Sequence, residues 1–93
     1  MTSYVILIDD IDVGAQNRVT EIIKTQRVSW WHWFRSTWIV VDSQDRSPAY
    51  WRALVEAASG VQRNLLVLEV AKSADWAARV VPDAAEWLRK NLP

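Results

Sequence analysis

Four short apolar segments set the strongest constraint on how this chain folds. They are rich in β-branched and aromatic residues and too short for buried helices, so each predicts a β-strand. The segments are Tyr4–Ile8, Ser29–Phe34, Thr37–Val41 and Leu65–Val70. Alternate residues of a strand point to opposite faces of its sheet, and in these segments both sets are largely apolar. The sheet therefore needs cover on both faces.

Helical patterns separate these segments. Apolar residues recur at helical spacing within Ala15–Gln26, with charged residues on the other side. The second pattern has well-marked ends, because Ser47 can cap a helix, Pro48 suits its first turn and Gly60 suits its terminus. A last helix is predicted from about Asp83 to Asn91.

The resulting order, β-α-β-β-α-β followed by a helix, predicts an α+β fold of the ferredoxin-like kind. Its usual sheet order, 4-1-3-2, makes all neighbouring strands antiparallel. The end of the first strand then lies beside the hairpin and the start of the fourth strand. A chain of 93 residues is expected to form a single domain. Residues 72–93 are its C-terminal extension.

The apolar character of both sheet faces predicts a partner. Two helices cover one face in this topology, and an exposed apolar face of that size is rare in monomers. Either a second copy of the chain or residues 72–93, packed on their own sheet or on the partner's, must cover the other face. We expect a homodimer whose interface contains the strand tryptophans, although these could equally fill the core or stack on bases. They are Trp30, Trp31, Trp33 and Trp38.

Composition excludes several kinds of site. The chain has no cysteine, so it has no disulfide and no thiolate nucleophile, which favours a reducing, cytoplasmic location. The single histidine, His32, cannot form a histidine metal cluster alone. No apolar run approaches the roughly 20 residues of a membrane-spanning helix, so no membrane partner is expected. The formal net charge is zero, so the whole molecule exerts no overall attraction on nucleic acid.

Three carboxylates follow the first strand. Asp9, Asp10 and Asp12 could hold Mg²⁺ or Mn²⁺, which need only one or two carboxylates and keep several waters. In a symmetric dimer, one carboxylate from each subunit could share the ion. The alternative is that these acids only end the strand and begin the next helix.

Basic residues concentrate in the following stretch. Arg18, Lys24, Arg27 and Arg35 lie within residues 18–35, where Glu21 is the single acid. These four residues are the candidates for binding nucleic acid. Arg35 and the hydroxyls of Ser36 and Thr37 fall in the predicted hairpin and could bind phosphate, or could form an ordinary polar turn. His32 could act as a general acid or base, or could simply pack within its strand.

Three segments carry a resemblance to a known family. They are Asp10-Ile11 at the end of the first strand, the run from Trp30 to Val40 (WWHWFRSTWIV), and the closing stretch from Trp87 to Leu92 (WLRKNL). Together they resemble small bacterial and phage proteins labelled SinR-like. That family is similar to the second CRISPR-associated protein and to virulence-associated protein D, which are ferredoxin-like homodimers linked to metal-dependent nuclease activity.

The resemblance implies roles for particular residues. Asp10 and Ser36 stand where the CRISPR-associated family has a strand-ending aspartate and a serine that begins the third strand. Asp9 replaces a tyrosine of that family. We therefore expect a homodimer that acts on or near nucleic acid, with Mg²⁺-dependent phosphodiester hydrolysis as the reaction. Asp10 and Ser36 would be the catalytic residues. Asp10 would hold the metal with help from Asp9 or Asp12, and Arg35 would bind the phosphate. The rival hypothesis is a non-catalytic module that binds a host protein.

Overall fold

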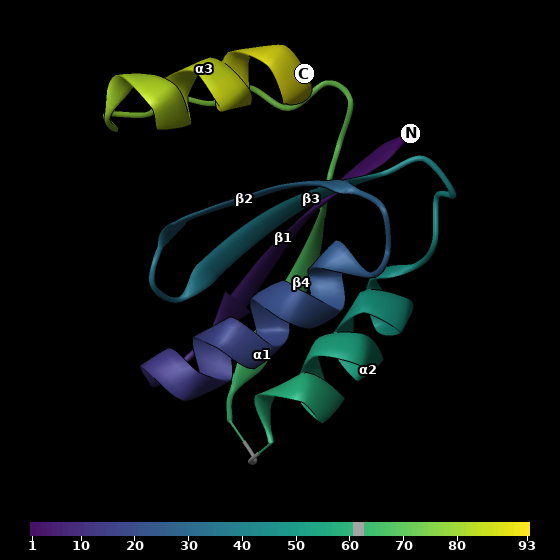
Figure 1. Ribbon diagram of the computed structural model, residues 1–93. Coiled ribbons are helices and arrows are strands. Elements are labelled where there is room, and N and C mark those ends of the chain that lie inside the picture. Colours follow the sequence, from purple (N-terminus) through teal and green to yellow (C-terminus); the bar gives the residue numbers. More distant parts are fainter. Residues whose placement is uncertain (61–62) are drawn as a thin grey trace.

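The computed structural model describes residues 1–60 and 63–93. Its elements follow the predicted order (Figure 1): β1 Thr2–Ile8, α1 Val13–Lys24, β2 Ser29–Phe34, β3 Thr37–Asp42, α2 Pro48–Ser59, β4 Leu65–Val70 and α3 Pro82–Asn91. The sheet order is β2-β3-β1-β4, and the paired strands are antiparallel. This is the predicted order read from the opposite edge, so the ferredoxin-like prediction is confirmed.

The main core lies between the sheet and the two helices that follow β1 and β3. Alternate residues of β1 and β3 face this layer and are almost fully buried: Tyr4, Ile6, Ile8, Trp38 and Val40. They pack against Val19 and Ile23 of α1 and against Trp51 and Val55 of α2. Each such side chain contributes about 1.5–3 kcal/mol when removed from water.

The C-terminal extension covers part of the opposite face of its own sheet. Figure 1 shows α3 on the side of the sheet away from α1 and α2. Ala84 and Leu88 of α3 are buried against Trp31 and Ile39, and Trp76 packs beside them. The Trp31 indole donates a 3.2 Å hydrogen bond from Nε1 to the Ala84 carbonyl. The extension therefore covers this face over β2 and β3 and reaches Val5 of β1.

Part of that face, over β4 and the end of β1, stays open. Leu7 of β1 and Leu66 and Leu68 of β4 keep 36%, 54% and 49% of their surface exposed. We call these three residues the leucine strip. They share one face, because Leu7 pairs with Leu66 and the next residue of that face in β4 is Leu68. Of the alternatives that the sequence left open for this face, residues 72–93 packed on their own sheet account for the covered part, and the leucine strip stays exposed.

Among the described residues, no helix is long and apolar enough to cross a bilayer.

Candidate functional site at the end of the sheet

Two backbone hydrogen bonds gather the predicted site residues at one end of the sheet. The Ile8 amide donates to the Ser36 carbonyl over 2.8 Å, and the Asp9 amide donates to the Asn64 carbonyl over 2.9 Å. The end of β1 therefore lies between the β2–β3 hairpin and the start of β4. Asp9, Ser36 and Asn64 line a shallow depression there, together with Leu7 and Leu66.

Asp10 occupies a constrained turn directly after β1. Its φ of 50° lies in the left-handed region, which aspartate and asparagine tolerate better than most residues. Arg63 fixes this turn by donating from Nε to the Asp10 carbonyl over 3.0 Å. The side chains of Asp9 and Asp10 are both exposed, and neither forms an ion pair with any side chain in the described part of the chain. Their carboxylates are free to bind a ligand.

Asp12 has a structural role that the other two acids lack. It caps α1, because its Oδ1 accepts a 2.7 Å hydrogen bond from the Ala15 amide, and its Oδ2 pairs with Arg63 Nη2 at 3.1 Å. The Ala15 hydrogen bond lowers the pKa of Asp12, partial burial opposes this, and the charges of Arg63 and Arg18 lower the pKa further. The sequence analysis gave two interpretations of the acidic run, a metal site or the start of a helix. Asp12 agrees with the second, because it caps α1.

The three acids do not converge on one point. Across residues 1–60 and 63–93, no group of three or more His, Cys, Asp or Glu side chains is arranged to hold a metal ion. The exposed pair Asp9 and Asp10 still offers the donors that Mg²⁺ prefers, which are one or two carboxylates completed by waters.

The predicted basic residues separate into different environments. Arg35 is exposed in the hairpin beside Ser36. Arg18 instead donates from Nε and Nη2 to the Ala58 and Ser59 carbonyls, each over 3.0 Å. Those carbonyls end α2, where a positive charge is favourable. Arg18 therefore joins α1 to the C-terminus of α2.

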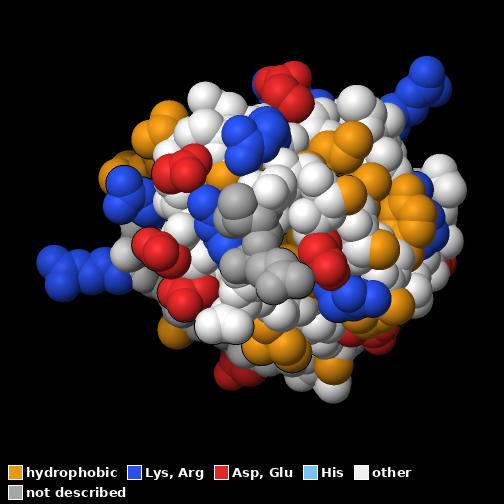
Figure 2. Space-filling model, turned by 90° about the horizontal axis from the view of Figure 1, so that it is seen from below, with side chains coloured by type: hydrophobic (Ala, Val, Ile, Leu, Met, Phe, Trp, Pro, Cys, Tyr) orange, Lys and Arg blue, Asp and Glu red, His pale blue; other side chains and the backbone are white. Residues whose placement is uncertain are grey.

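Lys24 and Arg27 lie at the far end of α1, away from Asp10. Lys24 pairs with Glu21 at 3.3 Å and lies 5.8 Å above the Trp30 ring. Arg27 follows the helix in a left-handed turn with a φ of 55°. The predicted nucleic-acid-binding residues thus do not form one continuous patch. Figure 2 likewise shows acidic and basic side chains interspersed on the face that carries the connection between α2 and β4.

The sequence analysis did not single out Arg63. Besides its contacts with Asp10 and Asp12, it donates from Nη1 to the Ser59 carbonyl over 3.0 Å. It therefore joins the β1 turn, the start of α1 and the end of α2. The available signal was a basic residue shortly after the helix-ending Gly60, a position where side chains often bind helix carbonyls.

The strand tryptophans lie mostly inside the chain. Trp38 is fully buried and donates from Nε1 to Thr20 Oγ1 over 3.1 Å. Trp31 is 3% exposed beneath α3, and Trp30 is half-buried. Trp33 alone of these four keeps about half of its surface exposed, at 52%. In this conformation, only Trp33 has much surface to offer a partner.

His32 is held between two polar groups and one ring. It stacks on Trp38 with ring centroids 4.0 Å apart and planes 4° from parallel. Its Nδ1 lies 2.9 Å from the Thr37 carbonyl oxygen and its Nε2 lies 3.2 Å from Gln16 Oε1. With these contacts, His32 agrees with the second of the two sequence hypotheses, a histidine packed within its strand.

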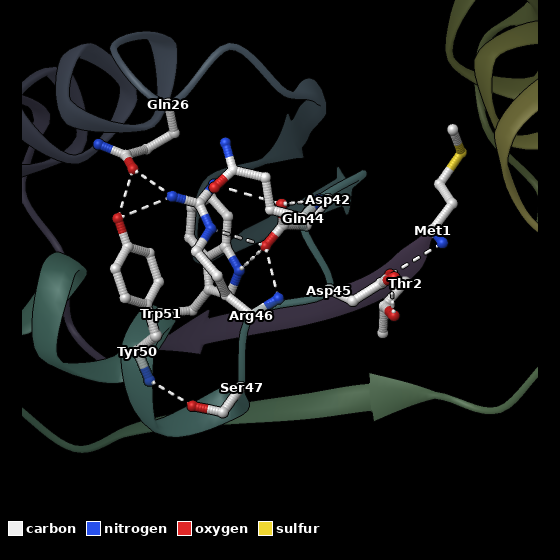
Figure 3. A network of polar contacts seen from close by, with 10 residues as sticks. All are labelled: Met1, Thr2, Gln26, Asp42, Gln44, Asp45, Arg46, Ser47, Tyr50 and Trp51. Carbon is white, nitrogen blue, oxygen red and sulfur yellow. Dashed lines mark hydrogen bonds and ion pairs between the residues drawn. The ribbon is translucent and has the colours of Figure 1, made fainter.

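A buried charged network lies at the opposite end of the sheet, and the sequence analysis missed it. Asp42 ends β3 with no exposed surface. Its oxygens accept hydrogen bonds from Arg46 Nε at 3.0 Å, Arg46 Nη2 at 3.2 Å and Trp51 Nε1 at 3.2 Å. Arg46 also donates from Nη1 to Gln26 and to the Tyr50 hydroxyl, both over 2.9 Å. Figure 3 shows these side chains pointing toward one another.

This network is electrostatically satisfied. Burial by itself raises the pKa of Asp42, but hydrogen bonds from the Arg46 guanidinium, the Gln44 and Arg46 amides and the Trp51 indole outweigh it, so the pKa of Asp42 is lowered. The same carboxylate raises the pKa of Arg46. Both groups therefore stay charged and mutually paired. The geometry is that of a structural clamp on the connection between β3 and α2.

No family model matches this chain, and neither a curated protein nor a solved structure matches it. The assignment to the ferredoxin-like fold therefore rests on the strand order and pairing of this chain alone.

Proposed function

We propose that the exposed end of the sheet around Asp10 binds the phosphodiester backbone of a nucleic acid together with Mg²⁺ and promotes its hydrolysis. One observation supports the proposal: the backbone hydrogen bond from Ile8 to Ser36 joins the end of β1, which Asp9 and Asp10 follow, to the Arg35–Ser36 turn. Carboxylates that could bind a metal and a guanidinium that could bind phosphate therefore lie at the same end of the sheet, and all four residues are exposed.

The donor set fits the ion. Asp10, assisted by Asp9, would hold Mg²⁺, which when bound supplies Lewis acidity and lowers the pKa of a coordinated water. Arg35 would bind phosphate oxygens through its planar fork of N–H groups, and the Ser36 hydroxyl would donate to the same group. Asp12 and Arg63 would position the turn that carries Asp10, since both already hold the adjoining backbone.

The Asp10→Asn variant tests this function. Asparagine tolerates the left-handed backbone at this position, so the change removes charge without straining the turn. We expect the wild type to cleave end-labelled RNA or DNA with Mg²⁺ and to lose cleavage with a chelator. Cleavage should fall by at least about 100-fold in Asp10→Asn, in line with the loss of a group that stabilises developing charge.

Asp83→Asn is the matched control, because Asp83 is an exposed aspartate in the first turn of α3. It should cleave like the wild type. Equal cleavage by Asp10→Asn and the wild type would remove Asp10 from the mechanism, and absence of cleavage by the wild type on both substrates would refute the catalytic proposal.

A second candidate is a non-catalytic module that binds another protein. The leucine strip favours it, because exposed apolar patches commonly mark interaction surfaces. Retention on immobilised nucleic acid separates the two candidates. Phosphate binding predicts that retention weakens with salt and weakens further in Arg35→Ala, while Arg89→Ala on α3 elutes like the wild type. Retention that changes neither with salt nor in the Arg35→Ala variant would favour the protein-binding module.

A further inference from the structure

A cavity lies between the C-terminal extension and its own sheet, on the face opposite the main core. Its volume is about 370 Å³, which falls within the range of small-molecule sites, roughly 300–1,000 Å³. Strands β1, β2 and β3 form one wall, and residues 76–80 together with α3 form the other. The main apolar residues of the two walls are Val5, Trp31, Phe34, Ile39, Trp76 and Leu88.

The two tryptophans of the lining already use their polar groups. Trp31 donates from Nε1 to the Ala84 carbonyl over 3.2 Å, and Trp76 donates from Nε1 to the Pro93 carbonyl over 2.9 Å. Both indoles therefore offer the cavity apolar surface only. A polar group placed against these walls would lose its water without gaining a hydrogen bond, and this is unfavourable. The body of any ligand here has to be apolar.

Arg79 adds a positive charge to the lining. It forms no ion pair with another residue in the described part of the chain, and this includes Asp75 and Asp83, the acids closest to it in sequence. Arg79 is exposed although it lines the cavity, and Phe34 of the same lining is 52% exposed. The cavity therefore opens to solvent beside a guanidinium that is free to bind an anion.

The shape of the lining favours an aromatic body and a carboxylate head. Trp31 and Phe34 meet edge to face with ring centroids 5.0 Å apart, and a third ring can extend such a cluster. A guanidinium binds a carboxylate through two parallel hydrogen bonds, which suits a single arginine. Thr37 also lines the cavity, so its hydroxyl is a further donor on the sheet side.

We propose that this cavity binds a small aromatic carboxylate, with the ring system between the sheet and residues 76–80 and the carboxylate on Arg79. The ligand would fill apolar space that the extension encloses and would complete the charge of Arg79. This binding goes beyond the proposed function and does not depend on it, because Asp10 does not line the cavity.

Titration calorimetry with naphthylacetate tests the proposal, because this probe joins two fused rings to one carboxylate. It should bind the wild type, and Arg79→Ala should weaken binding by about tenfold, the loss expected for a hydrogen bond between charged groups. The neutral analogue naphthylethanol should bind the wild type about tenfold more weakly than naphthylacetate. It should bind Arg79→Ala and the wild type equally. Octanoate, which keeps the charge on an alkyl chain, should bind about threefold more weakly than naphthylacetate.

Arg89→Ala is the matched control, since Arg89 is an exposed arginine of α3 that does not line the cavity. It should bind naphthylacetate like the wild type. Absence of binding to the wild type at millimolar concentration would overturn the proposal. Equal binding by Arg79→Ala and the wild type, or an equal loss in Arg89→Ala, would overturn the role of Arg79. Octanoate binding as tightly as naphthylacetate would overturn the aromatic body.

Nuclear magnetic resonance on the unmodified chain locates the ligand without any variant. Naphthylacetate should shift the indole N–H signals of Trp31 and Trp76, which line the cavity. The signals of Trp38 and Trp51 should move much less, because both rings lie in the main core on the other face of the sheet. Equal shifts of all four signals, or shifts confined to Trp38 and Trp51, would contradict binding in this cavity.

Discussion

The carboxylate of Asp42 lies at the end of β3 and receives hydrogen bonds from two side chains and two backbone amides. A buried charge of this kind persists only when it is paired and hydrogen-bonded, because desolvation otherwise favours the neutral form. Arg46 meets this need and is itself held by Gln26 and Tyr50. At the scale of single residues, this pair is where one substitution has the largest consequence.

Asp42→Asn should lower the free energy of unfolding by about 3 kcal/mol, the cost typical of breaking a buried ion pair from one side. The variant leaves the Arg46 guanidinium partly buried without its counter-charge. Chemical denaturation of both proteins at neutral pH measures the difference. Asp83→Asn, at an exposed position, should stay within about 0.5 kcal/mol of the wild type, and a similarly small loss in Asp42→Asn would show that the network contributes little.

The same residue predicts a pH dependence. The folded-state pKa of Asp42 is lowered, so its contribution to stability is present above the unfolded pKa of about 3.9. It is lost as the pH falls through the folded pKa. Unfolding followed from pH 7 to pH 2 should therefore show a steeper acid loss in the wild type than in Asp42→Asn. Parallel curves would mean that the pKa of Asp42 is the same in both states.

The ends of the helices show how local sequence sets an element. Ser47 caps α2 by accepting a 3.1 Å hydrogen bond from the Tyr50 amide, as predicted. Gly60 ends the helix with a φ of 79°, a conformation that costs glycine little and other residues more. The same element receives Arg18 at its last carbonyls, and a Cβ at Gly60 would lie 3.2 Å from that guanidinium.

The two glycines of the chain should respond to alanine with opposite signs. Gly60→Ala should destabilise the protein by about 1 kcal/mol, because alanine would be strained at positive φ. Gly14→Ala should stabilise it by about 0.5 kcal/mol, since Gly14 lies in α1 and its new Cβ would meet only ordinary contacts. Thermal unfolding of both variants measures the difference. Destabilisation by both changes to the same extent would show that backbone conformation is not the deciding factor.

Uneven cover of the sheet organises the whole molecule. The helices α1 and α2 cover one face, while residues 72–93 cover the other over β2, β3 and Val5 of β1 and leave the leucine strip exposed. The C-terminal cover depends on a few apolar side chains on a helix of ten residues. The stability of the fold therefore depends in part on how well this second face is covered.

Leu88→Ala should lower the free energy of unfolding by about 2–4 kcal/mol, because Leu88 is 4% exposed and packs with Trp31 and Ile39. Arg89→Ala, one residue along the same helix and exposed, should have little effect. Denaturation monitored by tryptophan fluorescence checks both. A loss below about 0.5 kcal/mol for Leu88→Ala would show that α3 is not docked on the sheet in solution.

Local pattern was sufficient for the elements and their order. Strand alternation, helical spacing and the capping residues Ser47 and Gly60 depend only on residues close in sequence, so they can be recognised from the sequence alone. The sheet order then follows from the connections, and with it the approach of the end of β1 to Ser36. Bounds shifted where packing extended an element, as at Asp42, which continues β3 by one residue beyond the predicted Val41.

What the sequence by itself determined was therefore the fold and the end of the sheet where the candidate site lies. Only the tertiary structure decided which charged groups are free and which are already paired. Asp12 and Arg18 looked like ligands by residue type, yet both bind helix ends. Asp42 was not singled out in the sequence, yet it is buried and paired with Arg46. The reason is that a side chain's hydrogen-bond partners are set by residues distant in sequence, and only packing brings those partners together.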